Sequence, residues 1–351
     1  MPARATVPSN EHGDPVTLHV GGQDVEITSP DKVFFPDCGS TKLDLAQYYV
    51  TIGEPLMRVM FDRPVLLQRF PNGTAGSSFF QKRIPESAPD WLQTTVVSTP
   101  NGTPSRALVI ADLAHVIWAV NLGCLGFHSW AVRASAAEYC DELRIDLDPQ
   151  PGTTFAMVGE TAHEVQRLLG DLDVTGFIKT TGNRGLHVYI RLSPQWDSVT
   201  VRSAAVAIAR DLERRRPDLI TAAWWKEQRG QRIFIDFNQN APHKTVFAPW
   251  SVRSRGHAPV SCPFPWEQLD VIDPNALTLS VVPARISQNG DPWLHMNDNP
   301  QSLEPFLELV TRDQANGLQD APWPPVYPKM AGEPSRVAPS RARKVAPDLG
   351  E

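Results

Sequence analysis

The chain has 351 residues, of which 41% are hydrophobic and 21% are charged, as in ordinary globular proteins, so wholesale disorder is excluded. Its 33 Lys and Arg against 39 Asp and Glu leave a formal net charge of −6, which excludes a uniformly basic coat for nucleic acid. Any contact with nucleic acid must therefore come from local basic clusters, and the length allows two domains or one large one.

The cysteines and the hydropathy of the chain limit its cellular setting. The four cysteines form no C-x-x-C pair, which argues against a zinc site or a disulfide framework and indicates a reducing, cytoplasmic setting. They are Cys38, Cys124, Cys140 and Cys262. No apolar run approaches about 18 residues, and the N-terminus has no apolar signal region, so neither a membrane span nor a secretory signal is predicted.

The predicted elements begin after a polar stretch, residues 1–14, where we expect a flexible leader. Thr41 followed by Asp44 resembles a capping box, which predicts that a helix begins near residue 42. Residues 65–70 follow a proline and are predicted to form a strand. Apolar residues at helical spacing predict three further helices, over residues 111–122, 160–170 and 199–215.

The C-terminal stretch is rich in Pro, Ser, Ala and Arg and almost lacks large aliphatic residues, so we predict a flexible tail over residues 328–351. Its basic residues are Arg336, Arg341, Arg343 and Lys344. They could hold a nucleic-acid backbone, and a merely solvated basic tail is the alternative.

Residues 143–149 alternate strictly between apolar and charged types. On a strand, the apolar residues would face the core, while Asp146 and Asp148 would project side by side from the opposite face with Arg144. Two carboxylates this close repel each other unless a cation lies between them, and hard divalent ions with oxygen ligands meet that need. The alternative is that these aspartates only line a solvated sheet face.

Residues 232–237 repeat this pattern. Their apolar positions place Asp236 on the opposite face of a second strand, together with Arg232. If the two strands are neighbours in one sheet, three aspartates can hold two metal ions about 3.5–4 Å apart, which stabilises the attacking and leaving oxygens in phosphoryl transfer.

Residues 177–190 are predicted to form a strand, a glycine-bounded turn and a second strand. Glycines let the backbone approach a phosphate closely. Thr181, Arg184 and His187 supply a hydroxyl, a fork of donors and an imidazole, in outline a cradle for a triphosphate. The alternative is a hairpin with an exposed polar turn and a hydrogen-bonded histidine.

Together these motifs resemble the polymerase domain of bacterial DNA ligase D, which belongs to the archaeo-eukaryotic primase superfamily. In chain order they are Leu-Arg-Ile-Asp-Leu-Asp-Pro, Lys-Thr-Thr-Gly-Asn-Arg-Gly-Leu-His-Val, Phe-Ile-Asp-Phe-Asn-Gln-Asn and Val-Phe-Ala-Pro-Trp-Ser-Val-Arg. The resemblance implies an α/β (α+β) primase-polymerase fold over residues 15–327. An antiparallel, RNA-recognition-like catalytic sheet flanked by helices would pack against an N-terminal α/β subdomain.

The resemblance also implies roles for individual residues. The family's metal-binding aspartates match Asp146, Asp148 and Asp236, and two Mn²⁺ or Mg²⁺ ions are implied. Its triphosphate contacts match His128, Thr181, Arg184, His187, Arg229 and Arg253. Its template-stacking aromatics and the lysine that follows them match Phe79, Phe80 and Lys82. Its lysines that grip the 5′-phosphate of a gapped or recessed DNA end match Lys32 and Lys42.

The DNA-contact residues have structural alternatives. Adjacent Phe79 and Phe80 cannot both face one core from a strand, so an exposed ring that stacks on a base is expected, with core packing of the other ring as the alternative. Lone lysines such as Lys32 and Lys42 are usually only solvated. For His128, the alternative is a packed core histidine.

The chain departs from the family's pattern in two ways. Threonine stands at position 181 where serine is more frequent, and arginine stands at 184 where lysine is frequent, which keeps the charge and adds bidentate reach. No K-x-D-G ligase motif occurs, since the nearest match, at residues 42–45, lacks the glycine. We therefore expect a stand-alone polymerase without ligase or nuclease modules.

These features predict a nucleotidyltransferase that extends primers and fills short gaps at DNA ends, with a preference for ribonucleotides implied by the family. Its implied partners are gapped, recessed or broken DNA, nucleoside triphosphates, and a separate DNA ligase with end-binding repair proteins, in a bacterial, nucleoid-associated setting. Two alternatives stay open: a de novo primase of the same superfamily, and a non-catalytic module that binds DNA ends.

Overall fold

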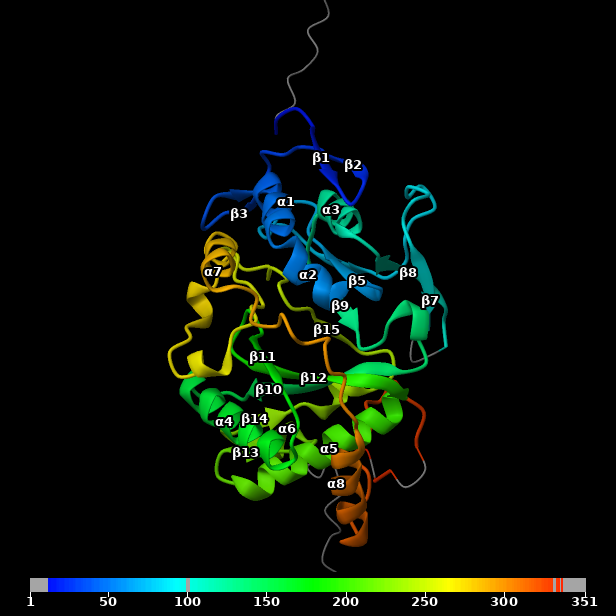
Figure 1. Ribbon diagram of the computed structural model, residues 1–351, viewed down its shortest axis with the longest axis vertical. Coiled ribbons are helices and arrows are strands. Elements are labelled where there is room, and N and C mark those ends of the chain that lie inside the picture. The colour runs from blue at the N-terminus through cyan, green and yellow to red at the C-terminus, as the bar shows by residue number, and fades with distance from the viewer. Residues whose placement is uncertain (1–11, 99–101, 331–332, 335, 337–351) are drawn as a thin grey trace, which may run out of the picture.

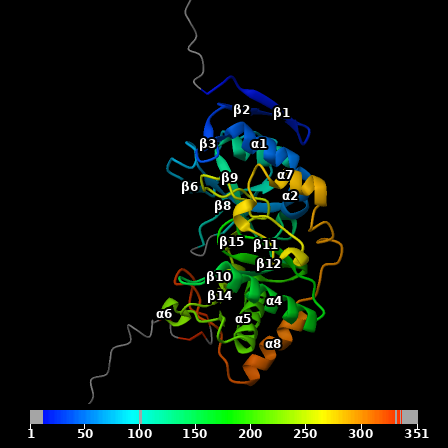
Figure 2. The same cartoon turned by 90° about the vertical axis from the view of Figure 1, so that its left-hand side faces the viewer.

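The computed structural model describes residues 12–98, 102–330, 333, 334 and 336. Figures 1 and 2 show two β-sheets stacked between two groups of helices. One outer group consists of α1 (Lys42–Thr51), α2 (Gly53–Met60) and α3 (Leu113–Asn121), and the other of α4 (Phe155–Asp171), α5 (Ser198–Arg215) and α8 (Glu304–Ala315). The two sheets therefore face each other in the middle of the molecule.

The first sheet has six strands in the order β15-β9-β5-β8-β7, with β6 paired to β5. They are β5 (Arg63–Arg69), β6 (Phe79–Gln81), β7 (Thr94–Val97), β8 (Ser105–Ile110), β9 (Cys124–Trp130) and β15 (Thr245–Phe247). Two small antiparallel sheets precede it, formed by β1 (Val16–Val20) with β2 (Gln23–Ile27), and β3 (Val33–Phe35) with β4 (Ser40–Thr41). Its core is shared with α1, α2 and α3.

The second sheet has five strands in the order β11-β12-β10-β14-β13. They are β10 (Cys140–Pro149), β11 (Phe177–Thr180), β12 (Leu186–Trp196), β13 (Ile220–Thr221) and β14 (Ile233–Ile235). Its neighbours are antiparallel except for the short β13–β14 pair. The apolar face packs on α4 and α5, which confirms the predicted mixed α/β fold with an antiparallel sheet under the aspartate motifs.

Shorter elements complete the described chain. They are α6 (Lys226–Arg229), α7 (Val282–Asn289) and the 3₁₀ turns η1 (Ala134–Ala136), η2 (Phe237–Asn240), η3 (Trp266–Gln268) and η4 (Pro274–Ala276). Within the described ranges, no helix combines the length and the apolar character needed to cross a bilayer.

The predicted elements are found where the sequence places them, with shifted ends. The capping box at α1 is present, since the Thr41 hydroxyl accepts from the Asp44 amide and the Asp44 carboxylate accepts from the Thr41 amide. The strand predicted over 65–70 begins two residues earlier, at Arg63. The helix predicted over 160–170 begins at Phe155, because the Thr154 side chain caps it by accepting from the amide of Met157 at 3.3 Å.

Most residues of the predicted leader and tail lie outside the described residues, including Arg341, Arg343 and Lys344. Two described residues of the tail contact the preceding segment. Glu333 accepts from the backbone amide of Trp323 at 2.7 Å, and Arg336 pairs with Glu333 and donates to the carbonyl of Tyr327.

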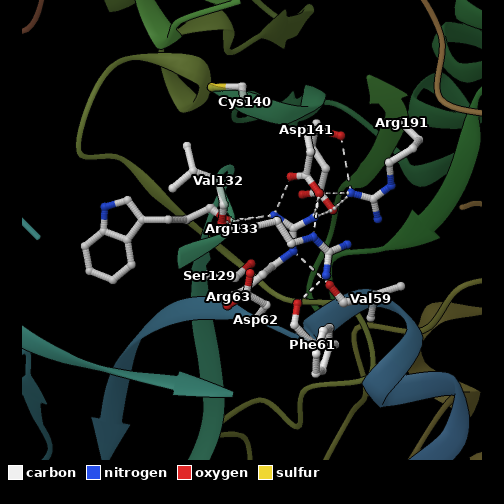
Figure 3. A network of polar contacts seen from close by, with 12 residues as sticks. Val59, Phe61, Asp62, Arg63, Ser129, Val132, Arg133, Cys140, Asp141 and Arg191 are labelled. Atoms are coloured by element: carbon white, nitrogen blue, oxygen red, sulfur yellow. Dashed lines mark hydrogen bonds and ion pairs between the residues drawn. The ribbon is translucent and has the colours of Figure 1, made fainter. Parts of the chain in front are cut away.

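A buried ion network joins the two sheets. Figure 3 shows three arginines converging on Asp141 of β10. They are Arg63 of β5, Arg133, which directly precedes η1, and Arg191 of β12. The distances from Asp141 oxygens to the three arginine nitrogens are 2.7, 2.7 and 2.6 Å. Glu142 adds a second carboxylate to the network beside Arg63. Because the charges come from both sheets and are removed from water, the network fixes how β10 sits against the first sheet.

Candidate active site

Asp146 and Asp148 lie on the face of β10 that points away from α4 and α5. The alternating apolar residues of this strand are buried in the second core, as predicted. The side chain of Asp146 is 17% exposed, whereas Asp148 lies at the exposed end of the strand, where its carboxylate accepts from Gln150 at 3.0 Å. The two carboxylates therefore project from one edge of the sheet.

Asp236 reaches the same place by a different local structure from the one predicted. The strand β14 ends at Ile235, and Asp236 caps the 3₁₀ turn η2, where its carboxylate accepts from the amide of Asn238 at 3.1 Å. Arg232 precedes the strand and donates to the carbonyl of Gln228 at 2.8 Å. Since β14 pairs with β10, the expected neighbourhood of the three aspartates holds, but Asp236 does not belong to an alternating strand face.

The protein disfavours ionisation of the three carboxyl groups, so their pKa values are raised. Burial raises the pKa of Asp146 to about 6, although the charges of Lys179 and Arg253 act against this rise. Burial and the neighbouring Asp146 raise the pKa of Asp236 to about 6 as well. The pKa of Asp148 is also raised, by burial and by Asp146. Three neighbouring carboxyl groups with raised pKa values supply the oxygen donors that hard divalent cations prefer.

The aspartates do not form a closed cage by themselves. Within the described part of the chain, no three or more His, Cys, Asp or Glu side chains converge on one point in the way that a preformed metal site requires. The carboxylates of Asp148 and Asp236 instead accept from Gln150 and Gln239 at 3.0 and 2.8 Å. Bound cations would therefore have to draw the carboxylates together.

The predicted cradle is the turn between β11 and β12. The Thr181 hydroxyl accepts from the amides of Asn183 and Gly185 at 3.2 and 3.3 Å, so its own proton stays available to a ligand. Gly182 has a φ of +67°, and a Cβ there would lie 2.8 Å from Cγ of Arg253. Glycine is required at this position by both the backbone conformation and the close approach of the arginine.

Arg253 closes the cradle from the loop that follows β15. Its Nε donates to the carbonyl of Thr181 at 2.8 Å, and its guanidinium lies 3.6 Å from the ring centre of Phe247. Burial lowers its pKa to about 10, which still leaves it charged at neutral pH. Arg184 is exposed on the turn itself.

These groups surround one cavity of about 160 Å³, which we call the phosphate cavity. It is lined by Asp146, Leu147, Asp148, Pro149, Thr181, Asn183, Arg184, Gly185, His187 and Arg253. Two of the three predicted metal ligands and four of the six predicted triphosphate contacts thus share a single space. A negatively charged ligand held by the cations at the turn would extend toward the aspartates.

The two predicted histidines contribute buried ring nitrogens. His187 is the cross-strand neighbour of Asp146, and its Nε2 lies 3.2 Å from Asp146 Oδ1. Burial holds its pKa well below the usual range, so the ring is neutral. His128 comes from β9 of the other sheet, and burial lowers its pKa to about 3. His187 Nδ1 and His128 Nε2 have no hydrogen-bond partner among the described residues.

Arg229 lies on α6, outside the lining of the phosphate cavity. It donates to the carbonyls of Ala223 and Trp224 at 3.0 Å each, and its guanidinium stacks 3.4 Å from the ring centre of Phe234. Burial lowers its pKa, while the charges of Asp236 and Asp148 raise it. Arg229 is therefore near the aspartates, although its donors are directed to its own loop.

Phe79 and Phe80 are both exposed on β6, so neither packs in a core. Their exposed fractions are 47% and 55%, and Lys82 directly after the strand is exposed too. The ring of Phe80 meets His128 edge-on with centres 5.4 Å apart, and Arg69 lies 5.2 Å from the centre of Phe79. The exposed aromatic pair thus adjoins the side of the site that His128 forms.

Lys32 and Lys42 lie near each other, since the charge of Lys32 contributes to the lowered pKa of Lys42. Burial is the larger cause, and together they bring this pKa to about 8. Lys42 is only 5% exposed, and its Nζ donates to Thr28 and to Asn121 at 2.7 Å each. The Nζ of Lys32 donates to the carbonyl of Pro71 at 2.8 Å. Lys42 is therefore a buried structural cation, not the solvated lysine of the alternative.

Sequence reasoning missed Lys179. This fully buried lysine on β11 pairs across the sheet with His187, which pairs in turn with Asp146, so the three side chains form a row on one face. Its Nζ donates to Ser261 Oγ at 2.6 Å. The sequence contained a signal for this residue, because the alternation of a strand over residues 177–181 places Lys179 on the same face as the predicted phosphate contact Thr181.

Comparisons with known proteins identify the family of the chain. A family model described as the LigD primase-polymerase domain matches residues 41–293. The multifunctional non-homologous end joining protein LigD of Mycolicibacterium smegmatis is 33% identical over 269 residues, 76% of this chain and 35% of that protein. The bifunctional LigD of Bacillus subtilis is 31% identical over 288 residues, 82% of this chain and 46% of that protein. The chain thus spans less than half the length of these curated relatives.

A solved structure has the same fold. The polymerase domain from Mycobacterium tuberculosis ligase D, in complex with DNA, superposes with a TM-score of 0.74 at 32% identity, covering 79% of this chain and 99% of that chain. The sequence-based family assignment and the prediction of an enzyme are confirmed. This chain belongs to the LigD primase-polymerase domain family, a family of nucleotidyltransferases.

Proposed function

We propose that the chain is a DNA-dependent nucleotidyltransferase that extends primer 3′ ends and fills short gaps at DNA breaks. The observation that carries the proposal is the phosphate cavity, in which Asp146 and Asp148 face the cradle of Thr181, Arg184 and Arg253. The structural neighbour was solved with DNA, and the relatives are named for end joining, which supports DNA ends as the substrate. The preference for ribonucleotides rests on the family resemblance.

In this proposal, Asp146 and Asp148 would hold two divalent cations, Mn²⁺ or Mg²⁺, and Asp236 would hold the one that activates the primer 3′-hydroxyl. When bound, these ions supply charge stabilisation for the attacking and leaving oxygens. The Thr181 hydroxyl and the guanidinium groups of Arg184 and Arg253 hold the β- and γ-phosphates. Catalysis would then be mostly positioning and electrostatic stabilisation.

The DNA contacts extend the site along the first sheet. The ring of Phe80 meets that of His128, which meets Phe247. Phe247 in turn contacts Arg253 of the phosphate cavity. A templating base stacked on the exposed rings of β6 would therefore lie on the Arg253 side of a nucleotide bound in that cavity. Lys32, assisted by the buried charge of Lys42, would hold the 5′-phosphate across a gap. A separate DNA ligase and end-binding proteins are the proposed partners for completing repair.

The test is primer extension on gapped DNA with Asp146→Ala and Asp148→Ala. Each variant should lose about 10²–10³-fold in rate or more while keeping its affinity for gapped DNA, because it loses a ligand of the cations that would stabilise the negative charge of the transition state. Asp90→Ala, at an exposed aspartate, is the matched control. Incorporation by the Asp146 and Asp148 variants at the rate of the control would overturn the proposal.

Two further assays distinguish the proposed function from de novo priming and from non-catalytic end binding. Products made on a single strand without a primer would identify de novo priming. DNA-end binding that is unchanged by triphosphate and divalent metal, with no incorporation, would identify a non-catalytic end-binding module.

A further inference from the structure

A second cavity, of about 370 Å³, adjoins the phosphate cavity, and we call it the outer cavity. It is lined by Pro149, Thr153, Thr154, Phe155, Asn183, Arg184, Arg255, Ile272, Asp273, Pro274 and Asn275. The two cavities share Pro149, Asn183 and Arg184. Asp146, His187 and Arg253 line only the phosphate cavity, so the outer cavity continues from the end at the turn.

The lining of the outer cavity suits a planar, polar-edged ring system. Phe155, Ile272 and Pro274 give it apolar walls, while Asn183 and Asn275 offer amide donors and acceptors. Its volume lies in the range of about 300–1,000 Å³ that is usual for small-molecule sites. These are the properties of a nucleoside pocket, because a base presents apolar faces and a hydrogen-bonding edge.

Arg255 links the outer cavity to the phosphates. It is exposed and donates a hydrogen bond to Asn183 Oδ1, and its positive charge acts on Arg253 in the phosphate cavity. A guanidinium at this place can hold a bridging phosphate and can also stack on a base. The carboxylate of Asp273 is engaged locally, since it accepts from the amide of Asn275 at 2.9 Å.

The aspartates, the turn with Arg184 and the outer cavity follow one another in space, and this order gives the direction of a bound nucleotide. Its α-phosphate must lie at the aspartates, so the terminal phosphate lies at the turn and a substituent on it would enter the outer cavity. We propose that the outer cavity binds the second nucleoside of a dinucleoside polyphosphate, and that this class of molecule also serves as a nucleotide donor. The inference rests on the proposed nucleotidyltransferase function and names a further substrate for the same site.

With diadenosine tetraphosphate the reaction balances. The primer 3′-oxygen bonds to one terminal phosphorus atom of the tetraphosphate chain, and the bond from that phosphorus to its bridging oxygen breaks. AMP is added to the primer, ATP leaves, and the 3′-hydroxyl proton passes to solvent. No electrons are exchanged with another reactant.

The test compares ATP with diadenosine tetraphosphate, freed of ATP by phosphatase, in single-nucleotide gap filling opposite a templating T. The wild-type chain should add AMP from both donors and release one ATP per AMP added from the tetraphosphate. Asn275→Trp, which fills the outer cavity, should lower kcat/KM for the tetraphosphate by about tenfold or more and change that for ATP less than about twofold. Arg255→Ala should lower tetraphosphate use more than ATP use.

Ala276→Trp is the matched control, because Ala276 is an exposed neighbour in η4 that does not line the outer cavity. It should leave the use of both donors unchanged. The inference is overturned if the wild-type chain uses ATP but not the tetraphosphate, or if Asn275→Trp and Arg255→Ala affect both donors equally. Absence of incorporation from ATP itself would instead overturn the proposed function.

Discussion

The backbone amide of Asp236 donates a hydrogen bond to the carbonyl oxygen of Asp146 at 2.9 Å. This bond joins the start of η2 to the middle of β10 and holds the two residues together, although their carboxylates repel each other. The backbone thus keeps in place a pair of charges that the metal-free protein would be more stable without.

Asp236→Asn should stabilise the metal-free protein at high pH. The folded-state pKa of about 6 exceeds the unfolded value of 3.8, so ionisation of this carboxyl destabilises the fold as pH rises through this interval. The full effect, about 2–3 kcal/mol, is present above pH 7 and vanishes below about pH 4. Urea unfolding in EDTA at pH 4, 6 and 8 measures it. A variant that matches the wild type at pH 8 contradicts the prediction, and Asp90→Asn is the control.

Divalent metal should reverse this destabilisation. Mn²⁺ or Mg²⁺ should raise the thermal midpoint of the wild-type protein at pH 8 more than at pH 5, because the ions bind the deprotonated carboxylates. Asp146→Asn should remove most of the increase. Thermal unfolding with and without metal checks this, and an equal shift in the variant would speak against these aspartates as ligands.

The two lysines should respond differently to mutation. Lys32→Ala should reduce the preference for a 5′-phosphorylated gap with little change in stability. Lys42→Ala should reduce this preference and also destabilise the fold by about 1–3 kcal/mol, because the part-buried hydrogen bonds from its Nζ to Thr28 and Asn121 are lost. Since the pKa of Lys42 is about 8, the preference should weaken as pH rises from about 7 to 9. Binding of gapped DNA with 5′-phosphate and 5′-hydroxyl ends measures both effects; a pH-independent preference would exclude Lys42.

Phe80→Ala should weaken binding to a single-stranded template overhang by about 1–3 kcal/mol, because a base loses its stacking partner. Stability should change little, since the ring is more than half exposed. Val96→Ala, at an exposed residue of β7 in the same sheet, serves as the control. Fluorescence anisotropy with labelled overhangs gives the affinities. Unchanged affinity in both Phe79→Ala and Phe80→Ala would remove these rings from the DNA site.

Asp141→Asn should destabilise the protein strongly. The three arginines in Figure 3 would lose their shared negative charge at Asp141 while Arg63 and Arg191 stay buried, at a cost of about 3–5 kcal/mol. Asp218→Asn, in the exposed pair with Arg216, should leave the urea midpoint nearly unchanged. Equal urea midpoints for the two variants would show that the network does not hold the sheets together.

Local rules predicted the parts of the fold that depend on neighbours in sequence. The capping box at Thr41 and the alternation in β10 are of this kind. Asp236 was placed on a strand because apolar residues at 233, 235 and 237 alternate, yet the carboxylate bonds to the Asn238 amide and turns the chain into η2 instead. A period of two cannot distinguish these outcomes when the strand is only three residues long.

Contacts between residues distant in sequence determine the burial of Lys42 and the position of His128, which patterns among neighbouring residues do not predict. The solvated alternative for Lys42 is wrong, because the side chain is buried and donates a hydrogen bond to Asn121, which is distant in sequence. Its role at a 5′-phosphate stays a prediction. His128 lies near the site because its strand β9 pairs with β15, where Phe247 contacts both the His128 ring and the Arg253 guanidinium. Without the family resemblance, no spacing along the chain would have linked His128 to Asp146.

The chain passes repeatedly between the two cores. Residues 20–127 build the first core, residues 140–237 the second, residues 248–296 return mainly to the first, and residues 303–321 return to the second. No single cut in the backbone can therefore release one sheet as an intact unit. A fragment that ends between the two cores would lack residues of both, so we expect the two layers to fold as one unit.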